Sequence, residues 1–307
     1  MNAMIRTLTI LGAALLVTAC QQGPKLADKA LPAQTMTYAD GVSTLYYQVH
    51  AGDWQQRDTV IFTYGATGCV SMKHHTPDYF EAIRFHGVLF ALNKRYVGDL
   101  DQATTCGEDF IRANISEQRM KDFSEFINTK LDQLDFSPRN VVVIGVSEAA
   151  DAAVRAAALN PRINQLVVIG SGGYTMRKSL QVMKQHAPSH QVPDVDAFAL
   201  EYAGKPIDLN DSWYGNPVYW WMDILDVDPM ADYLNVDIPI LVGVGEQDDS
   251  QPLESVHYLQ RQFSMHGKQN LQVNVYPGVG HSLTADAKRD LFGTLNMRLA
   301  NRASLAH

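Results

Sequence analysis

The sequence lacks the features that mark a nucleic-acid-binding protein or a zinc enzyme. Its 25 Lys and Arg residues are outnumbered by 33 Asp and Glu, the formal net charge is −8, and the basic residues form no cluster. Nucleic-acid-binding proteins usually carry a basic face that meets the phosphates, so this charge balance argues against that class. No His and carboxylate spacing predicts a zinc site, and we expect no metal.

Long apolar runs are also missing. The apolar stretch at residues 8–17 is too short to cross a bilayer. The composition is otherwise that of an ordinary globular protein, with 46% hydrophobic and 19% charged residues among 307, which is enough for one large core. We therefore expect a single α/β domain that carries an insertion.

The first twenty residues have the pattern of an export signal. Arg6 supplies a small positive region and the apolar stretch follows it. The next residues, Val17-Thr18-Ala19-Cys20, resemble the bacterial lipobox, whose cysteine is lipidated and becomes the first residue of the mature protein. We expect residues 1–19 to be a lipoprotein signal peptide and Cys20 to carry lipid. The alternative is an ordinary signal peptide that is cleaved near Ala19.

A lipid on Cys20 would anchor the protein in the cell envelope. The residue after this cysteine is Gln21 rather than the aspartate of an inner-membrane retention signal, which favours the outer membrane, with the protein facing the periplasm. Residues 20–34 have no strong periodicity and predict a tether, and residues 35–307 then form the folded domain.

Cysteine is scarce, with only Cys69 and Cys106 left after Cys20. Export places these two residues in an oxidising compartment, where disulfides form and persist. We therefore expect a disulfide between Cys69 and Cys106.

The stretch at residues 139–159 predicts a strand, a sharp turn and a helix. Residues 141–144 are a continuous β-branched run, as in a strand buried on both faces of a parallel sheet, and residues 149–159 are rich in alanine. Between them, Gly145-Val146-Ser147-Glu148-Ala149 fits the Gly-x-Ser-x-Gly pattern of a nucleophile elbow, with alanine in the last position. Ser147 is therefore the candidate nucleophile. The alternative is a serine that caps the N-terminus of the helix.

Residues 174–236 break the alternation of strands and helices. The stretch contains five prolines and a cluster of aromatic residues, which predicts a cap inserted in the fold. The aromatic side chains either line the active site or form a small core inside the cap. For the first alternative, the candidate substrate-binding residues are Trp213, Trp220 and Trp221, together with Tyr64 at the end of an earlier strand.

A serine hydroxyl is a weak nucleophile and needs a base, which in turn needs a carboxylate to orient it. The chain supplies Ser147, Asp248 and His281 in this order, each in a loop after a predicted strand. Loops at the carboxyl ends of parallel strands meet at one edge of the sheet, so these three side chains can come together. Asp249 is the alternative orienting residue, and Asp248 is preferred because its spacing to Gly245 and Pro252 resembles that of the α/β-hydrolase superfamily.

These three ordered motifs resemble the α/β-hydrolase superfamily from about residue 37 to the end of the chain, and are most similar to its dienelactone hydrolase and prolyl oligopeptidase-like branch. The resemblance implies an α/β fold with a mostly parallel, doubly wound sheet and a cap between the sixth and seventh strands. It also implies an oxyanion hole made by the backbone N–H groups of Glu148 and of Ala66, which lies in the glycine-bearing loop at residues 64–69.

The expected reaction is acyl transfer through an acyl-enzyme, which needs no cofactor. We expect an exported serine hydrolase that cleaves small carboxylic esters. An exopeptidase for short peptides is the first alternative, and a non-catalytic binding lipoprotein that keeps the fold is the second. A propeller of the oligopeptidase kind would need several blades of roughly 40–50 residues, for which the chain has no room.

Overall fold

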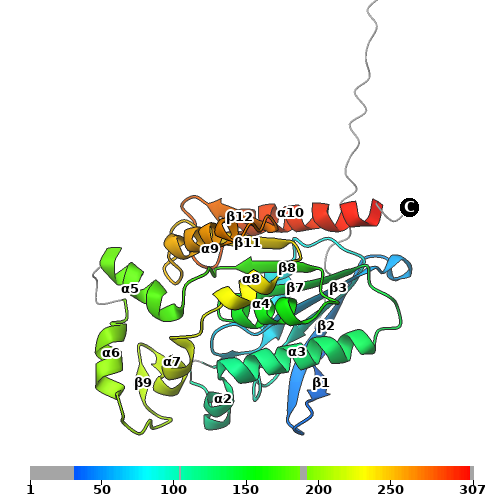
Figure 1. Ribbon diagram of the computed structural model, residues 1–307. Coiled ribbons are helices and arrows are strands. Elements are labelled where there is room, and N and C mark those ends of the chain that lie inside the picture. The colour runs from blue at the N-terminus through cyan, green and yellow to red at the C-terminus, as the bar shows by residue number, and fades with distance from the viewer. Residues whose placement is uncertain (1–30, 104, 187–191, 305–307) are drawn as a thin grey trace, which may run out of the picture.

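The computed structural model describes residues 31–103, 105–186 and 192–304 (Figure 1). The predicted signal peptide, Cys20 and most of the predicted tether lie outside the described residues. The end of the tether differs from the expectation, because Leu31 is only 6% exposed and packs in the core, and the first strand already begins at Gln34. The folded domain therefore starts a few residues earlier than the composition indicates.

One sheet of eight strands organises the described chain, in the order β1-β2-β5-β3-β7-β8-β11-β12. β1 and β2 pair antiparallel, as do β2 and β5, and all the other neighbours are parallel, so the expected mostly parallel sheet is confirmed. The strands are β1 (Gln34–Thr37), β2 (Ser43–Ala51), β3 (Thr59–Tyr64), β5 (Gly87–Leu92), β7 (Asn140–Val146), β8 (Gln165–Ile169), β11 (Ile240–Gly245) and β12 (Leu271–Tyr276). A small separate ladder pairs β4 (Cys69–Val70) with β6 (Gln102–Ala103).

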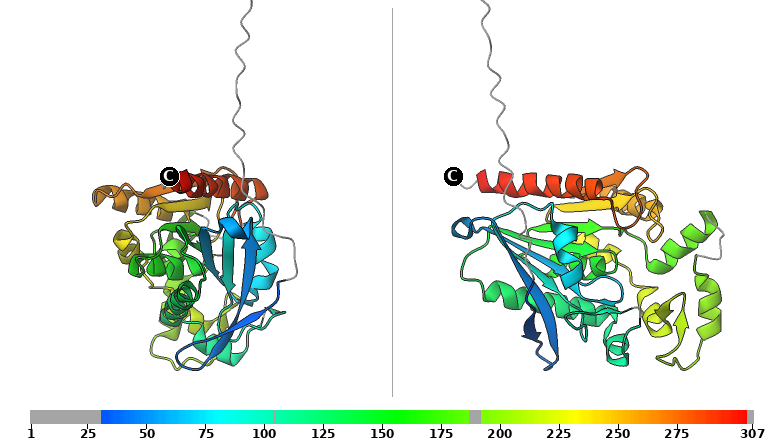
Figure 2. Two further views of the ribbon diagram at one scale, coloured as in Figure 1. Left: turned by 90° about the vertical axis from the view of Figure 1, so that its right-hand side faces the viewer. Right: turned by 180° about the vertical axis from the view of Figure 1, so that it is seen from behind.

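Helices cover both faces of the sheet, and the two layers are seen edge-on in Figure 2. One face carries α3, α4, α8 and α9, and the other carries α1 and α10. None of the helices in the described ranges is long and apolar enough to cross a membrane. The helices of the main domain are α1 (Thr76–Phe80), α2 (Glu108–Ala113), α3 (Ser116–Asp132), α4 (Ala149–Leu159), α8 (Met230–Asn235), α9 (Leu253–Met265) and α10 (Ala285–Ser304).

The continuous apolar runs of the central strands follow from this two-sided covering. Every residue of β3 and β5 is buried, and successive side chains of a strand point to opposite faces. Val60 and Phe62 pack under α3, whereas Ile61 between them packs with α1 and α10. Each such buried side chain stabilises the fold by about 1.5–3 kcal/mol. The rigid core fixes the carboxyl ends of the parallel strands, where the candidate catalytic loops begin.

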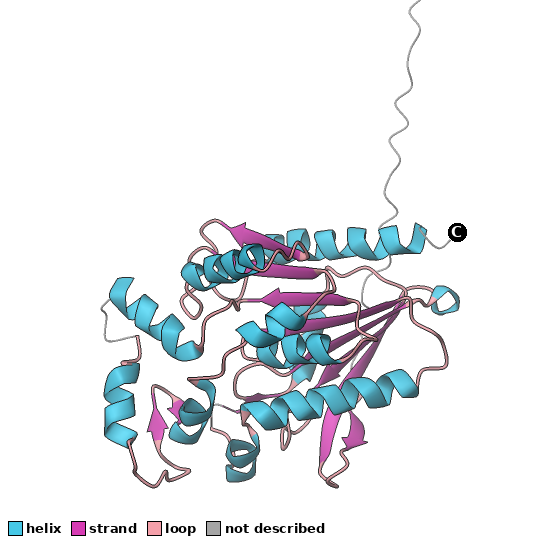
Figure 3. Cartoon of the chain, viewed as in Figure 1, coloured by secondary structure: helices cyan, strands magenta, loops and turns pink. Residues whose placement is uncertain are grey.

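The expected cap is inserted between β8 and β11, which are the sixth and seventh strands of the main sheet along the chain. It lies beyond the carboxyl ends of the strands (Figure 3) and has a small hydrophobic core of its own. α8 falls within the predicted cap range, but Met230 and Tyr233 of this helix pack in the core of the main domain. The cap itself comprises α5 (Met176–His186), α6 (Val195–Tyr202), β9 (Ser212–Trp213), β10 (Asn216–Pro217) and α7 (Val218–Ile224).

Candidate active site

Ser147 sits in the sharp turn that joins β7 to α4. Its backbone has a positive φ of 53°, a conformation that costs a residue with a side chain on the order of 1–3 kcal/mol. Glycine is required at position 145, because a Cβ there would lie 2.6 Å from both the Ala150 Cα and the Ala153 Cβ. Ala149 in the last position of the motif is buried at the start of α4, so the turn accepts one methyl group at this point.

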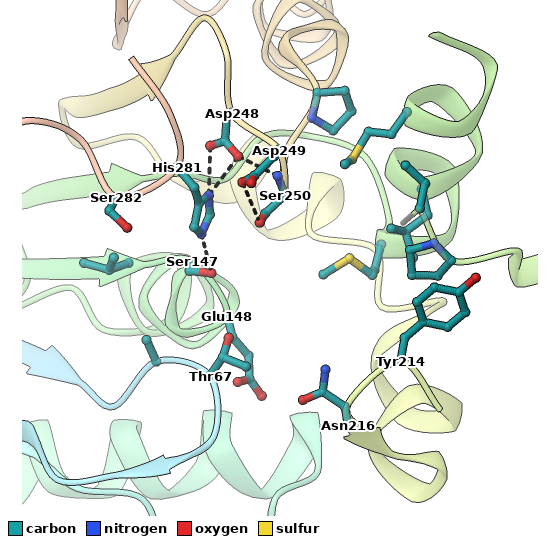
Figure 4. Close-up of a pocket in the computed structure, with 18 of the residues that line it drawn as sticks. Thr67, Ser147, Glu148, Tyr214, Asn216, Asp248, Asp249, Ser250, His281 and Ser282 are labelled. Atoms are coloured by element: carbon teal, nitrogen blue, oxygen red, sulfur yellow. Dashed lines mark hydrogen bonds and ion pairs between the residues drawn. The ribbon is translucent and has the colours of Figure 1, made fainter. Parts of the chain in front are cut away.

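The Ser147 hydroxyl does not cap α4. The residue at the N-cap position is Glu148, which makes no side-chain capping bond, and the Ser147 Oγ lies 2.9 Å from His281 Nε2 (Figure 4). The capping alternative is therefore wrong, and the hydroxyl faces a potential base.

His281 Nδ1 lies 2.9 Å from each carboxylate oxygen of Asp248. A carboxylate only accepts hydrogen bonds, so Nδ1 carries the proton and Nε2 is left to accept from the serine. The Asp248 side chain is only 1% exposed, and its Oδ1 also accepts from the backbone N–H groups of Ser250 and Gln251 at 2.8 Å each. These bonds hold the carboxylate in place, and it in turn orients the imidazole ring.

Asp249 does not reach the imidazole ring. Its side chain is exposed, and its Oδ1 lies 3.4 Å from the hydroxyl of Ser250 (Figure 4). Of the two adjacent carboxylates, the structure brings Asp248 to His281 and leaves Asp249 at the surface of the same loop.

The pKa of His281 is raised above the ordinary value of 6.5. Burial alone would lower it, because burial disfavours the charged imidazolium, but the hydrogen bond to Asp248 and the negative charges of Asp248 and Asp249 outweigh that effect. The ring is therefore a stronger base than a free histidine, which suits it to take a proton from a hydroxyl.

Two glycines near the carboxyl ends of strands allow His281 to reach its place. A Cβ on Gly245 at the end of β11 would lie 2.1 Å from the carbonyl oxygen of Val279, so this glycine lets the histidine loop approach the sheet. Gly170 at the end of β8 has a positive φ of 63°, and a Cβ on it would lie 2.9 Å from His281 Cε1. The spacing to Asp248 already singles out Gly245, whereas the only sequence signal at Gly170 is a glycine directly after a buried strand.

One candidate oxyanion donor, Glu148, belongs to the elbow, and the other, Ala66, belongs to the loop at residues 64–69. Ala66 and Glu148 both border the cavity in front of Ser147, and within the described residues neither backbone N–H has a protein acceptor. The loop that carries Ala66 is anchored at its start, where the N–H of Gly65 donates to the carbonyl of Leu92 at 3.0 Å. Two N–H groups are thus available to a negatively charged oxygen beside the serine.

The expected disulfide between Cys69 and Cys106 is present, with the two Cα atoms 5.7 Å apart. Cys69 follows Ala66 by three residues and belongs to β4, which pairs with β6. Both sulfurs lie in a small hydrophobic cluster with Val97 and Phe110. The bond therefore ties the far end of the loop at residues 64–69, hereafter the oxyanion loop, to the segment between β6 and α2.

A cavity of about 1,230 Å³ opens in front of Ser147, between the main domain and the cap. Trp220 and Trp221 border it as expected, but Trp213 does not. The Trp213 ring packs 4.5 Å from that of Phe198 inside the cap, so the expected contact of Trp213 with the cavity is corrected. In the aromatic cluster, Trp220 and Trp221 thus line the cavity, whereas Trp213 packs in the core of the cap.

Tyr64 borders the cavity but is mostly a core residue. It is only 2% exposed, and its ring stacks on Phe123 of α3 with the centroids 5.3 Å apart. Burial raises the pKa of its hydroxyl above the ordinary value of 10. Tyr64 therefore shapes the wall near the oxyanion loop rather than offering a free hydroxyl.

The sequence did not identify most of the apolar wall. Tyr214, which belongs to the predicted aromatic cluster, and Asn216, which was not predicted, lie on the cap side of the cavity (Figure 4). Three residues of α5 were detectable in principle, because they recur at helical spacing on one face. These are Met176, Leu180 and Met183.

A buried ionic cluster lies beneath the cavity, and it too was not predicted. The Glu148 carboxylate forms ion pairs with Lys94 and Arg119, and all three side chains are at most 3% exposed. Burial lowers the pKa of Lys94 to about 8, and the charge of Glu148 partly opposes that effect. Lys94 therefore stays protonated at neutral pH. In the described part of the chain, no group of three or more His, Cys, Asp or Glu residues could hold a metal ion.

Comparison with known proteins agrees with the observed architecture. Residues 196–304, about a third of the chain, match the model of the dienelactone hydrolase family, a span that includes Asp248 and His281 but not Ser147. A comparison with curated protein sequences gave no match.

Several solved structures share the fold. Est1E from Butyrivibrio proteoclasticus has a TM-score of 0.63 at 14% identity, over 89% of this chain and 99% of that one. The Pyrococcus furiosus esterase PF2001 has a TM-score of 0.57 at 14% identity, over 91% and 97%. The Pyrococcus horikoshii acylaminoacyl peptidase has a TM-score of 0.59 at 12% identity, over 89% of this chain and 41% of that longer one. The chain thus has the α/β-hydrolase fold, with a C-terminal region similar to the dienelactone hydrolase family.

Proposed function

We propose that this protein is a serine hydrolase that cleaves small carboxylic esters through an acyl-enzyme. The observation that carries the proposal is the continuous hydrogen-bonded chain from Ser147 through His281 to Asp248, which opens on a cavity beside two unbonded N–H groups. The likeness of residues 196–304 to the dienelactone hydrolase family supports it.

The geometry accounts for each step of acyl transfer. Ser147 Oγ attacks the ester carbonyl while its proton passes to His281 Nε2, 2.9 Å away. The negative oxygen of the tetrahedral intermediate accepts from the N–H groups of Glu148 and Ala66, each donor contributing about 2.7–4 kcal/mol to the stability of the transition state. The intermediate then collapses, the bond to the alcohol breaks, and the alcohol leaves with the proton from His281.

Water completes the cycle by the same route. His281 accepts a proton from the water molecule as it attacks the acyl-serine, and returns it to Ser147 Oγ when the carboxylic acid is released. The Asp248 carboxylate stabilises the imidazolium in both halves of the reaction without itself taking the proton.

The cavity wall favours an ester with an apolar acyl or alcohol group. Methionine, leucine and tryptophan side chains of the cap form one side of it, opposite the oxyanion loop. Since the same triad also cleaves peptide bonds, a panel of acyl esters and aminoacyl amides tests the choice. Faster turnover of the amides would replace the ester assignment with that of an exopeptidase. Failure of a fluorophosphonate probe to label Ser147 would leave a binding protein instead.

The dependence of rate on pH follows from the His281 base. The ring accepts a proton only when neutral, and its pKa is raised above 6.5, so kcat/KM should rise with pH with a midpoint above 6.5. Asp249→Asn removes one of the charges that raise this pKa, so the midpoint should move to lower pH while the maximal rate changes little. A pH profile of both proteins provides the check, and a midpoint that moves upward in the variant would contradict the proposed electrostatics.

We also propose that the mature protein is anchored to the outer membrane by a lipid on Cys20, on the grounds of the lipobox-like sequence at residues 17–20. Cys20→Ala should abolish incorporation of labelled fatty acid and move the protein from the membrane pellet to the periplasmic extract. Fractionation and labelling of the native host measure both. Unchanged partitioning of the variant would refute the anchor without affecting the proposed chemistry.

A further inference from the structure

The Glu148 side chain is held by two hydrogen bonds and an ion pair, whose partners come from three separate parts of the chain. Its carboxylate accepts from Lys94 Nζ at 2.8 Å and from Trp220 Nε1 at 2.8 Å, and Arg119 Nη1 lies 3.0 Å away. A buried carboxylate is stable only where charges and hydrogen bonds of this kind satisfy it. The side chain therefore has one well-defined position, and the backbone of the residue is restrained with it.

Each of the three side chains that hold Glu148 belongs to a segment that contacts or supports the candidate oxyanion hole. Lys94 comes after β5 and packs on the oxyanion loop, since a Cβ on Gly65 would lie 3.4 Å from its Cγ. Arg119 is on α3, in the helical layer that supports the elbow. Trp220 is on α7 of the cap. Through its carboxylate, Glu148 is thus connected to the oxyanion loop that carries Ala66, to the core and to the cap. Glu148 itself supplies the second candidate N–H donor of the oxyanion hole.

A second contact, close to that of Trp220 on α7, also holds the cap against the main domain. Asp223, three residues after Trp220 and so on the same side of α7, accepts from the Ser116 N–H at 2.7 Å and from the Ser116 hydroxyl at 2.6 Å. Ser116 is the first residue of α3. α7 is therefore docked on the main domain at two points, and one of them is the carboxylate of the residue after the nucleophile.

We propose that Glu148 is a positioning residue that couples the cap to the oxyanion hole, with the Trp220 indole as the contact from the cap. The inference rests on the proposed function. N–H donors stabilise an oxyanion only when they are held 2.7–3.1 Å from the place where the charge develops. With the indole in place, the Glu148 side chain is fixed at its far end and its N–H stays aimed at the oxyanion. Without the indole, the residue gains freedom and the donor loses its alignment.

Trp220→Phe tests the coupling, because it keeps an aromatic ring on α7 and removes the N–H donor together with the five-membered ring of the indole, a loss of volume that the control variant Trp221→Phe reproduces. We expect kcat and kcat/KM for a short ester to fall together, by about 10–100-fold, with KM nearly unchanged. A trifluoromethyl ketone forms a tetrahedral adduct with the serine, and its oxyanion would occupy the hole. Its inhibition constant should rise by the same factor as kcat/KM falls.

Trp221→Phe is the matched control. It removes an indole N–H from the neighbouring residue on α7, which also borders the cavity, but this donor bonds to the carbonyl of Trp213 inside the cap at 2.6 Å. Its effect should fall on KM, and the ratio of the ketone inhibition constant to KM should stay at the wild-type value. A Trp220→Phe variant that likewise changes KM alone would overturn the coupling and leave Trp220 as part of the cavity wall.

Rates are to be expressed per serine that fluorophosphonate labels at completion, so that unfolded protein is not counted as slow enzyme. Glu148→Gln provides a second variant, since it keeps an acceptor for the indole but loses the charge that holds Lys94 and Arg119. It should show the same loss of kcat at similar KM, and wild-type kcat in this variant would also overturn the inference. Wild-type turnover in Ser147→Ala would refute the proposed serine hydrolase itself. Wild-type kcat in Trp220→Phe and Glu148→Gln, with Ser147→Ala inactive, would refute only the coupling.

Discussion

Ser147→Ala is expected to lower kcat for an ester substrate by roughly 10⁴–10⁶-fold, because the alanine methyl group cannot form the acyl-enzyme. The fold should be retained, since among the described residues the hydroxyl forms a hydrogen bond only with His281, and the strained turn is set by Gly145 and the backbone. Steady-state kinetics together with circular dichroism and thermal unfolding measure both effects. A rate above a tenth of that of the wild type would refute the mechanism.

His281→Ala should produce a loss of similar size, and the double variant should be little worse than either single one, since members of a triad act as a unit. Asp248→Asn should lower kcat by about 10⁴-fold, because an amide no longer holds the imidazole in the required tautomer. Asp249→Asn is the natural control, as it makes the same chemical change one residue away on an exposed side chain. If the change at Asp249 proves the damaging one, the assignment of the orienting carboxylate is wrong.

Removal of the disulfide by Cys69→Ser and Cys106→Ser is expected to lower the free energy of unfolding by roughly 3–4 kcal/mol. The bond spans 37 residues of sequence, and a crosslink of this span restricts the unfolded chain strongly. Urea unfolding of the wild type and the double variant measures the difference. Mass spectrometry of a non-reduced digest of protein from the periplasm establishes the bond itself, and free thiols at both positions would end the prediction.

Reduction of the Cys69–Cys106 disulfide should lower the enzymatic rate under conditions in which the protein stays folded. Cys69 lies three residues beyond the candidate donor Ala66, so loss of the bond frees the far end of the oxyanion loop while the sheet remains intact. A mild reductant should therefore lower kcat at unchanged circular dichroism, and alkylation of both thiols should make the loss permanent. If activity and ellipticity fall only together, the bond stabilises the domain without restraining the oxyanion hole.

The fold and the grouping of the Ser147, His281 and Asp248 side chains could be predicted because their signals are local. A buried parallel strand is a short continuous apolar run, and Ser147 and Asp248 each follow such a run, whereas His281 follows the alternating edge strand β12. Gly145 precedes Ser147, Gly245 precedes Asp248, and Gly280 directly precedes His281. The order of the three along the chain then restricted the possible folds.

The ionic cluster and the cap wall could not be predicted, because their partners are distant in sequence. Lys94 and Glu148 are 54 residues apart, and Trp220 lies 72 residues beyond Glu148. A charged residue considered alone is expected at the surface, since burial of an ion is costly without a partner. Within the cap, nothing local distinguishes Trp213, which is packed inside, from Trp220, whose ring borders the cavity.

At Ser147, the left-handed backbone lowers the stability of the fold, but the same residue supplies the candidate nucleophile. Glycine adopts a positive φ with little strain, so Ser147→Gly would relieve part of the cost that serine bears there. In a protein that only binds ligands, Ser147→Gly would relieve this strain without removing a group that the function needs. A hydrolase would lose its nucleophile. A serine in this conformation, with its hydroxyl directed at an oriented imidazole, is thus easier to reconcile with a catalyst than with a binding protein.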